Sequence, residues 1–247
     1  MFERVVAIQR HALAPDDLDL AWSLSTLGTL YANSEQNARA RELGEEALAV
    51  QERALGPDHT DVAETLDMLG NLCRAEGDHA RALEHHGRET AIWEKAVGTE
   101  HPNYGMALSN YARDLADLGR LPEAIATAQR SLEILNRVLP ADHPTPTYTQ
   151  VYLANMYRDA GEPALSRKQL EAALPVRAQA FGDESLQVLE VVIELGRISA
   201  MQGRREEARA HYERALRIAV LNEQEGELAT IRAELAAVTA APPAHGS

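Results

Sequence analysis

The sequence repeats itself every 42 residues, and this period limits the fold more than any other feature. Residues 42 apart are called a column here. One column reads His59, His101, His143 and Ser185, and another reads Gly77, Gly119, Gly161 and Gly203. No insertion interrupts the register. A chain with such a period is predicted to fold as a stack of similar units, because each unit can bury its apolar face only against its neighbours.

Each period contains two helical patterns. In residues 60–75, Val62, Leu66, Leu69 and Cys73 follow helical spacing, and Gly77 suits the position just past a helix. Acidic residues at the starts of the units, joined by Pro102 and Pro144 in two of them, favour a new helix there. We therefore predict an all-α fold, a right-handed α-solenoid of stacked antiparallel helix pairs at 18–56, 60–98, 102–140, 144–182 and 186–221.

The two ends differ from the repeating units. Residues 1–14 match the second half of a unit, which favours a chain cut from a longer protein over a helix that caps the stack. Residues 227–239 carry one apolar stripe, from Leu228 to Val238, and are predicted to form a capping helix. Residues 1–239 would then be a single solenoid, and 240–247 a disordered tail.

Composition excludes several functions. A formal charge of -14 argues against nucleic-acid binding, which needs clustered positive charge. No apolar run is long enough to cross a membrane, and the first residues lack the apolar core of a signal peptide. The single cysteine, Cys73, fits a reducing compartment. We therefore expect a cytoplasmic protein without nucleic-acid or membrane partners.

Reactive side chains are present without the context that catalysis needs. Cys73 falls in an inward-facing column, where a structural thiol is expected. His86 shares a column with Leu170 and Tyr212, which indicates a core position, and His85 points elsewhere on its helix. No second pair of ligands stands at i, i+4, and no phosphate-binding loop is present. We predict no catalytic residue, no metal site and no cofactor, so the chain is not expected to be an enzyme.

The residues Leu27, Gly28, Tyr31, Ala40, Ala47 and Leu48 resemble the tetratricopeptide repeat. The period of 42 residues and the connectors around His59, His101 and His143 are similar to the kinesin-light-chain type of that family. The resemblance covers about residues 1 to 220. It implies a helical scaffold, with the first helix of each pair lining a concave face, that holds peptides or other proteins.

That implied face carries basic and amide side chains. The expected peptide-binding residues are Asn71, Arg74, Asn110, Arg113, Asn155, Arg158 and Arg197. Arginine binds carboxylates in pairs of hydrogen bonds, and asparagine can bind a peptide backbone. This favours an extended acidic peptide as ligand. The alternative is ordinary solvated or self-paired charge, since Arg113 and Asp117 stand at i, i+4.

Three functions follow from this interpretation. The first is a protein–protein interaction scaffold that binds an extended, acidic peptide segment in its concave groove. The second is a regulatory or substrate-recruiting segment of a larger kinase, NTPase or protease, motivated by the half unit at 1–14. The third is a structural module that associates with itself, although we expect a monomer or weak self-association.

Overall fold

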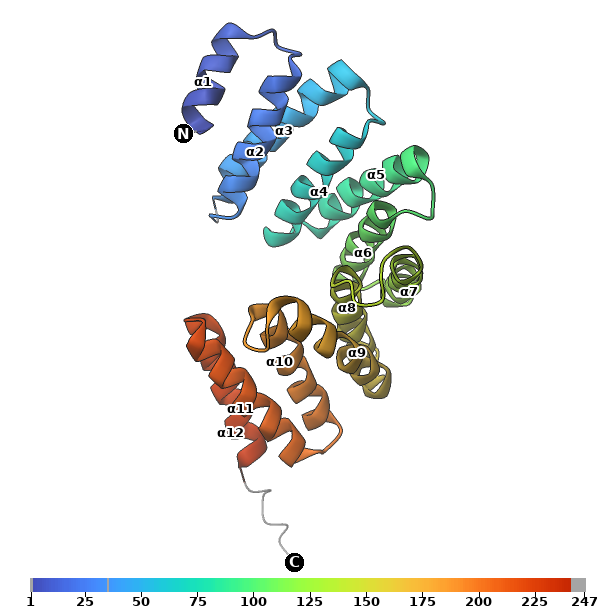
Figure 1. Ribbon diagram of the computed structural model, residues 1–247, viewed down its shortest axis with the longest axis vertical. Coiled ribbons are helices and arrows are strands. Elements are labelled where there is room, and N and C mark those ends of the chain that lie inside the picture. Colours follow the sequence, from blue (N-terminus) through green and yellow to red (C-terminus); the bar gives the residue numbers. More distant parts are fainter. Residues whose placement is uncertain (1, 35, 241–247) are drawn as a thin grey trace, which may run out of the picture. The chain divides into compact units, whose positions relative to one another are not determined.

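The computed structural model describes residues 2–34 and 36–240, which contain twelve α-helices and no strand (Figure 1). The all-α prediction is confirmed. Apart from Ala240, the predicted tail lies outside the described residues. The helices are α1 Phe2–Ala12, α2 Leu18–Ala32, α3 Asn37–Leu55, α4 Thr60–Ala75, α5 His79–Val97, α6 Pro102–Asp117, α7 Leu121–Val138, α8 Thr145–Asp159, α9 Pro163–Phe181, α10 Leu186–Met201, α11 Arg205–Leu221 and α12 Glu225–Thr239.

The chain divides into two compact units, one ending at Val138 and one beginning at Leu139. In the first unit, α2 packs on α3, α4 on α5 and α6 on α7, and each pair contacts the next. In the second unit, α8 packs on α9 and α10 on α11, and α12 covers α11. Within each unit, helices adjacent in sequence are thus neighbours in space, as stacked helix pairs require. A single continuous solenoid over 1–239 stays a prediction.

The repeating histidine starts the first helix of three pairs. The Nδ1 atoms of His59, His101 and His143 each accept a hydrogen bond, 3.2 Å long, from the backbone N–H two residues further on. In the fifth pair the hydroxyl of Ser185 accepts from the N–H of Val188 at 3.3 Å. These contacts satisfy N–H groups that a helix leaves without an internal partner. The column therefore caps helices, which explains its regular return.

Removing one of these caps should weaken the fold modestly. We expect His101→Ala to lower the free energy of unfolding by about 1 kcal/mol, the usual cost of an absent N-cap. His101→Ser should keep most of that stability, because Ser185 performs the same task with a hydroxyl. Urea denaturation of the three proteins measures the difference. Equal stability of the alanine and serine variants would contradict this role.

The first helix of the second pair ends at a glycine that no other residue replaces easily. Gly77 has φ of 81°, a left-handed conformation that costs side-chain-bearing residues energy. It allows the N–H of Asp78 to donate to the carbonyl of Cys73 at 2.8 Å, while its own N–H bonds to Arg74 at 3.0 Å. The two bonds close the helix in the usual glycine motif, and the chain turns directly into α5.

Small residues let the two helices of a pair approach closely. Ala40, Ala82, Ala124 and Ala208 are all fully buried. At Gly196, an added Cβ would lie 2.6 Å from the ring of Tyr212, so α10 and α11 touch only because that side chain is absent. Within residues 2–34 and 36–240, no helix has the length and apolar content needed to cross a lipid bilayer.

Candidate functional site

The expected binding residues of the first unit lie on α4 and α6 and contact acidic groups. Arg74 donates to the fully buried Asp114 at 3.2 Å and to the side-chain oxygen of Asn71. Asn71 and Asn110 both donate to Asp67, at 3.1 and 2.7 Å. Arg113, on the same helix as Asn110, is half-buried and has an interaction of its own. Asn71, Arg74 and Asn110 thus come together, through Asp67 and Asp114, as a network between neighbouring helix pairs.

The second unit shows a comparable arrangement around Glu194 on α10. Arg158 of α8 contacts this carboxylate, and Arg197 donates to it at 2.5 Å. Arg158 also holds Asn155 at 3.2 Å and Asp159 at 3.0 Å, and Arg197 reaches Glu234 of α12 at 2.8 Å. The Glu194 side chain is only 9% exposed. Its two arginines therefore stabilise a charge that burial would otherwise penalise.

Internal pairing is thus the observed state of Arg74, Arg158 and Arg197, and their use for a ligand stays a proposal. The sequence contained a signal for these pairs. Arg74 and Asp114 are 40 residues apart, Arg158 and Glu194 are 36 apart, and Arg197 and Glu234 are 37 apart. In each pair the acidic residue follows the arginine by slightly less than one 42-residue period. This spacing is the sequence pattern that indicates such an ion pair.

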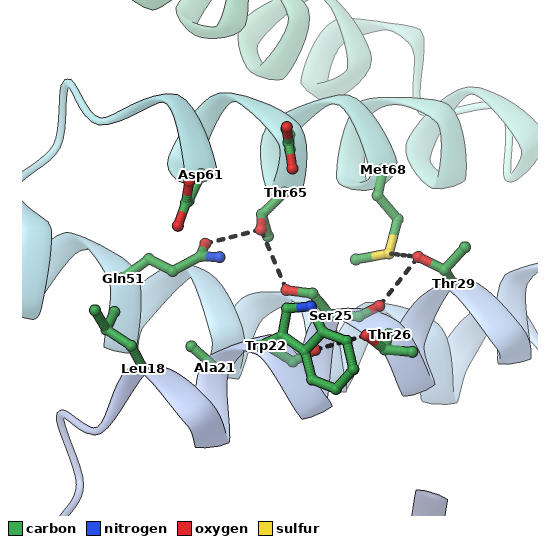
Figure 2. A pocket seen from close by; sticks show the side chains of 11 residues that line it. Leu18, Ala21, Trp22, Ser25, Thr26, Thr29, Gln51, Asp61, Thr65 and Met68 are labelled. Carbon is green, nitrogen blue, oxygen red and sulfur yellow. Dashed lines mark hydrogen bonds between the residues drawn. The ribbon is translucent and has the colours of Figure 1, made fainter.

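A pocket of about 330 Å³ opens between α2 and α4 in the first unit (Figure 2). Sequence reasoning missed it. Its wall includes Trp22, whose exposed fraction is 64%. Thr65 donates to Gln51 at 2.8 Å and lies 3.4 Å from Ser25. The pocket thus combines an exposed indole with hydroxyl and amide groups that can bind a peptide backbone.

The charged side chains at this pocket are acidic. Asp61 and Glu64 contribute to its wall, and none of the described residues that line it is basic. Burial raises the pKa of Glu64, and repulsion from Asp61 and Asp67 adds to the shift. An acidic ligand side chain would find no partner here. The pocket suits an apolar, neutral or basic group instead.

Trp22 belongs to a column that also contains exposed apolar residues. Met106 and Tyr148 stand 84 and 126 residues after it, two and three periods on, and their exposed fractions are 44% and 38%. The same column carries Glu64 and Glu190 in the other pairs. Single exposed apolar side chains are common on protein surfaces, and Trp22 is singled out because it also lines the pocket. The repeat register could have revealed them.

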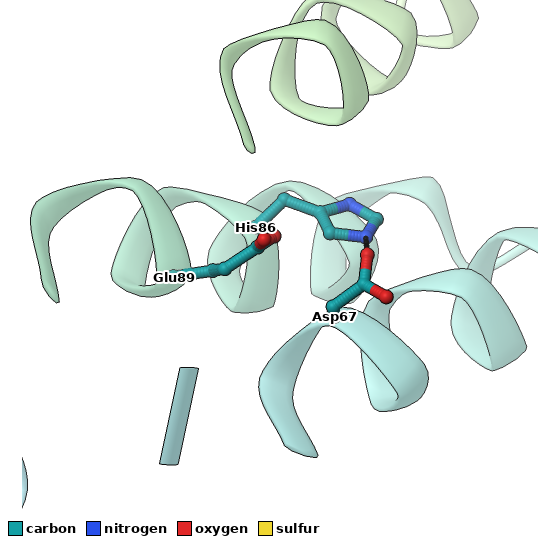
Figure 3. A group of neighbouring side chains, drawn as sticks. All are labelled: Asp67, His86 and Glu89. Atoms are coloured by element: carbon teal, nitrogen blue, oxygen red, sulfur yellow. Dashed lines mark ion pairs between the residues drawn. The ribbon is translucent and has the colours of Figure 1, made fainter. Parts of the chain in front are cut away.

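A polar cluster joins Asp67 of α4 to His86 and Glu89 of α5 (Figure 3), and Asp114 of α6 lies behind the histidine. His86 has no exposed surface, which confirms the predicted core position. Its Nδ1 pairs with Asp114, and its Nε2 lies 3.9 Å from Asp67. Glu89, one turn further along α5, is 5% exposed. Sequence spacing within one helix could not show this cluster, because its members come from three helices.

Burial is the largest cause of the raised pKa of Glu89. It raises the pKa of this carboxyl to about 9, with further increases from the charges of Asp67 and Asp114. Glu89 therefore keeps its proton at neutral pH. Burial also raises the pKa of Asp67, against the opposing effects of His86 and of hydrogen bonds from Asn71. The first unit thus contains a protonated carboxylic acid inside its helical core.

Cys73 behaves as the sequence predicts. The residue is 2% exposed, and burial raises the pKa of its thiol. A nucleophilic cysteine needs access and a lowered pKa. The structure therefore confirms a buried thiol on the packed side of α4.

Stacked helix pairs with a polar pocket on the first helices define a helical-repeat interaction scaffold. The tetratricopeptide repeat model matches residues 29–95, 81–137 and 147–219. The chain belongs to the tetratricopeptide repeat family. Among curated proteins no sequence matches it. Chains of this family typically serve as interaction modules rather than as catalysts.

Solved structures agree with this fold. A Podosopora anserina kinesin light chain structure of nearly identical TPR-like repeats has 25% identity and a TM-score of 0.68, covering 85% of this chain and 98% of that one. A Rap protein complexed with Competence and Sporulation Factor has 14% identity and a TM-score of 0.74, covering 94% and 66%. The Rap conjugation gene regulator of plasmid pLS20, in complex with the Phr* peptide, has 17% identity and a TM-score of 0.72, covering 90% and 60%.

Proposed function

We propose that this chain binds an extended peptide segment of a partner protein through the first helices of its pairs. The observation that carries the proposal is the pocket between α2 and α4, where the largely exposed Trp22 lies beside hydroxyl and amide groups. The Rap conjugation gene regulator of the same fold has been solved in complex with the Phr* peptide, which supports this mode. Because helix packing already holds the pocket residues, little ordering free energy is spent on binding.

We further propose that the ligand carries an acidic side chain where it meets Arg158. The Asp159 carboxylate that contacts its Nε is 57% exposed and can turn into water. A ligand carboxylate could then take its place while Glu194 stays paired. At the pocket of Trp22, in contrast, the ligand residue should be apolar, neutral or basic, because Asp61 and Glu64 repel negative charge.

The pocket is tested with Trp22→Ala. Peptides are first selected on the wild-type protein from a displayed random library, and their affinities are then measured by calorimetry. We expect the alanine variant to bind the selected peptides about 30-fold more weakly, since an interface tryptophan contributes about 2 kcal/mol. Leu165→Ala removes another exposed apolar side chain, on a second helix, and should change nothing. Unchanged affinity in Trp22→Ala would exclude this pocket.

The acidic preference is tested separately with Arg113→Ala combined with Arg158→Ala. Peptides with Asp or Glu should lose affinity, whereas the same peptides with Asn or Gln should bind both proteins alike. The variant should also be less stable, because Glu194 keeps only Arg197 as partner. Equal losses for acidic and amide peptides would show that the arginines support the fold and not the ligand.

A further inference from the structure

The buried cluster of the first unit breaks the pattern of its own columns. Ser25, Ser109, Val151 and Ile193 share the column of Asp67, and Leu30, Leu72, Met156 and Ile198 that of Asp114. The column of His86 holds Gly44, Ala128, Leu170 and Tyr212, and that of Glu89 holds Ala47, Ser131, Ala173 and Ala215. Four titratable groups thus replace small or apolar residues at one junction, which costs stability unless they have a task.

The cluster orients its histidine. The Nδ1 atom of His86 pairs with a carboxylate oxygen of Asp114, whose other oxygen accepts from Arg74 at 3.2 Å. A protonated Nδ1 leaves the Nε2 lone pair as the free coordinating atom. Metal-binding histidines are commonly held in this way, by a carboxylate behind the ring. The fixed orientation directs Nε2 towards Asp67 (Figure 3).

Two atoms of the cluster are buried and have no hydrogen-bond partner. They are Nε2 of His86 and Oε2 of Glu89, on side chains that are 0% and 5% exposed. Buried polar atoms in native proteins are nearly always satisfied. Both atoms lie beside the carboxylate of Asp67, whose Oδ1 is held by Asn71 and Asn110. The ligand atoms of the three residues all lie within 4.8 Å of one another.

We propose that Asp67, His86 and Glu89 bind one divalent transition-metal ion of the Zn²⁺ class. One imidazole nitrogen with two carboxylate oxygens favours such an ion over Mg²⁺ or Ca²⁺, which prefer oxygen alone. With bonds of about 2.1 Å, the ligand atoms of a tetrahedral ion lie about 3.4 Å apart. The ends of the two carboxylate side chains therefore need to move inward to close on the ion.

The surroundings suit a doubly positive ion. Asp67 and Asp114 supply negative charge with Arg74 beside them, and Glu89 would release its proton to solvent when it binds the ion. The side chain of Asp67 is 41% exposed, so the cluster has an opening to water on the side of α4. Water entering there can fill the remaining coordination position. The bound ion would join α4 and α5 directly and α6 through Asp114.

The test uses the full chain, stripped of metal with a chelator, and ZnCl₂ in a calorimetric titration. We expect one ion per chain at this cluster. Glu89→Ala and Asp67→Ser each introduce a residue that their own columns contain, so both variants should fold. Each should lose at least as much affinity as Asp114→Asn, which leaves the three ligands in place, removes the carboxylate behind His86 and beside Arg74, and should weaken binding about 10–100-fold.

Glu84→Ala is the matched control, because it removes an exposed carboxylate from the same helix. It should bind Zn²⁺ as the wild type does. Co²⁺ provides a second measurement, since its visible absorption reports a nitrogen and oxygen ligand set and should disappear in Glu89→Ala. Absence of stoichiometric binding would overturn the proposal. Equal binding by wild type, Glu89→Ala and Asp67→Ser would overturn it as well, because the ion would then sit on exposed histidines.

Discussion

Arg177→Ala should lower the free energy of unfolding by about 3 kcal/mol, a large fraction of what a domain possesses. Arg177 lies on α9 with no exposed surface. It donates to the hydroxyl of Thr147 at 3.0 Å, to the carbonyl of Gln187 at 2.8 Å and to Glu190 at 2.6 Å. Its guanidinium also stacks 4.8 Å from the ring centre of Tyr148. Alanine would remove these bonds from a fully buried position and leave a cavity there.

Lys168→Ala is the matched control for this prediction. Lys168 is an exposed basic residue on the same helix, so its removal should change the unfolding free energy by less than about 0.5 kcal/mol. Arg177→Lys should recover only part of the loss, because an ammonium group cannot reach three acceptors in the planar arrangement of a guanidinium. Urea denaturation followed by circular dichroism measures all four proteins. A stability loss shared by Arg177→Ala and Lys168→Ala would refute the assignment.

The second large effect concerns Glu89 and depends on pH. Its pKa is about 9 in the folded protein, against an ordinary 4.5. Between these values the unfolded chain releases the proton that the folded chain keeps, so stability falls as pH rises from 4.5 to 9. The gap corresponds to at most about 6 kcal/mol. Glu89→Gln should remove this loss, because glutamine resembles the protonated acid and does not ionise.

Unfolding free energies at pH 5, 7 and 9, with a chelator present, measure this effect. The unfolding free energy of Glu89→Gln, relative to that of the wild type, should increase from pH 5 to pH 7 and again from pH 7 to pH 9. The surrounding groups are Asp67 and Asp114, both acidic, with His86 and Arg74 beside them. Glu84→Gln, on the exposed side of α5, should follow the wild-type profile. Parallel profiles for wild type and Glu89→Gln would show that Glu89 is ionised in the fold.

The helical architecture could be predicted from the sequence because it depends on local signals. Apolar spacing, the connector histidines and glycines such as Gly77 act within one turn, and the observed helices α2 to α11 lie inside the predicted pairs. The opening segment at 1–14 contains α1, and the predicted capping segment contains most of α12. Burial of His86 also followed from its column, because residues at one register position face the same neighbour.

The partners of individual side chains were harder to predict. Register places Arg74 and Arg158 on the inner side of their helices, but it does not show which acidic group will meet them. Asp114 and Glu194 come from the next helix pair, and their buried charges attract the arginines that sequence reasoning reserved for a ligand. Glu89 was overlooked for a related reason. An isolated glutamate in a helix looks exposed until the packing of α4 and α6 is known.

The junction of the second and third pairs also limits how this array could be lengthened or shortened. Deleting the 42-residue period that contains α6 and α7 would bring α8 behind α5. Met156 would then stand where Asp114 now meets Arg74 and His86, since the two residues share a column. A buried guanidinium would then face a thioether. Helix pairs that meet through apolar residues can be duplicated or deleted one at a time. The second and third pairs of this chain, in contrast, have to be kept together.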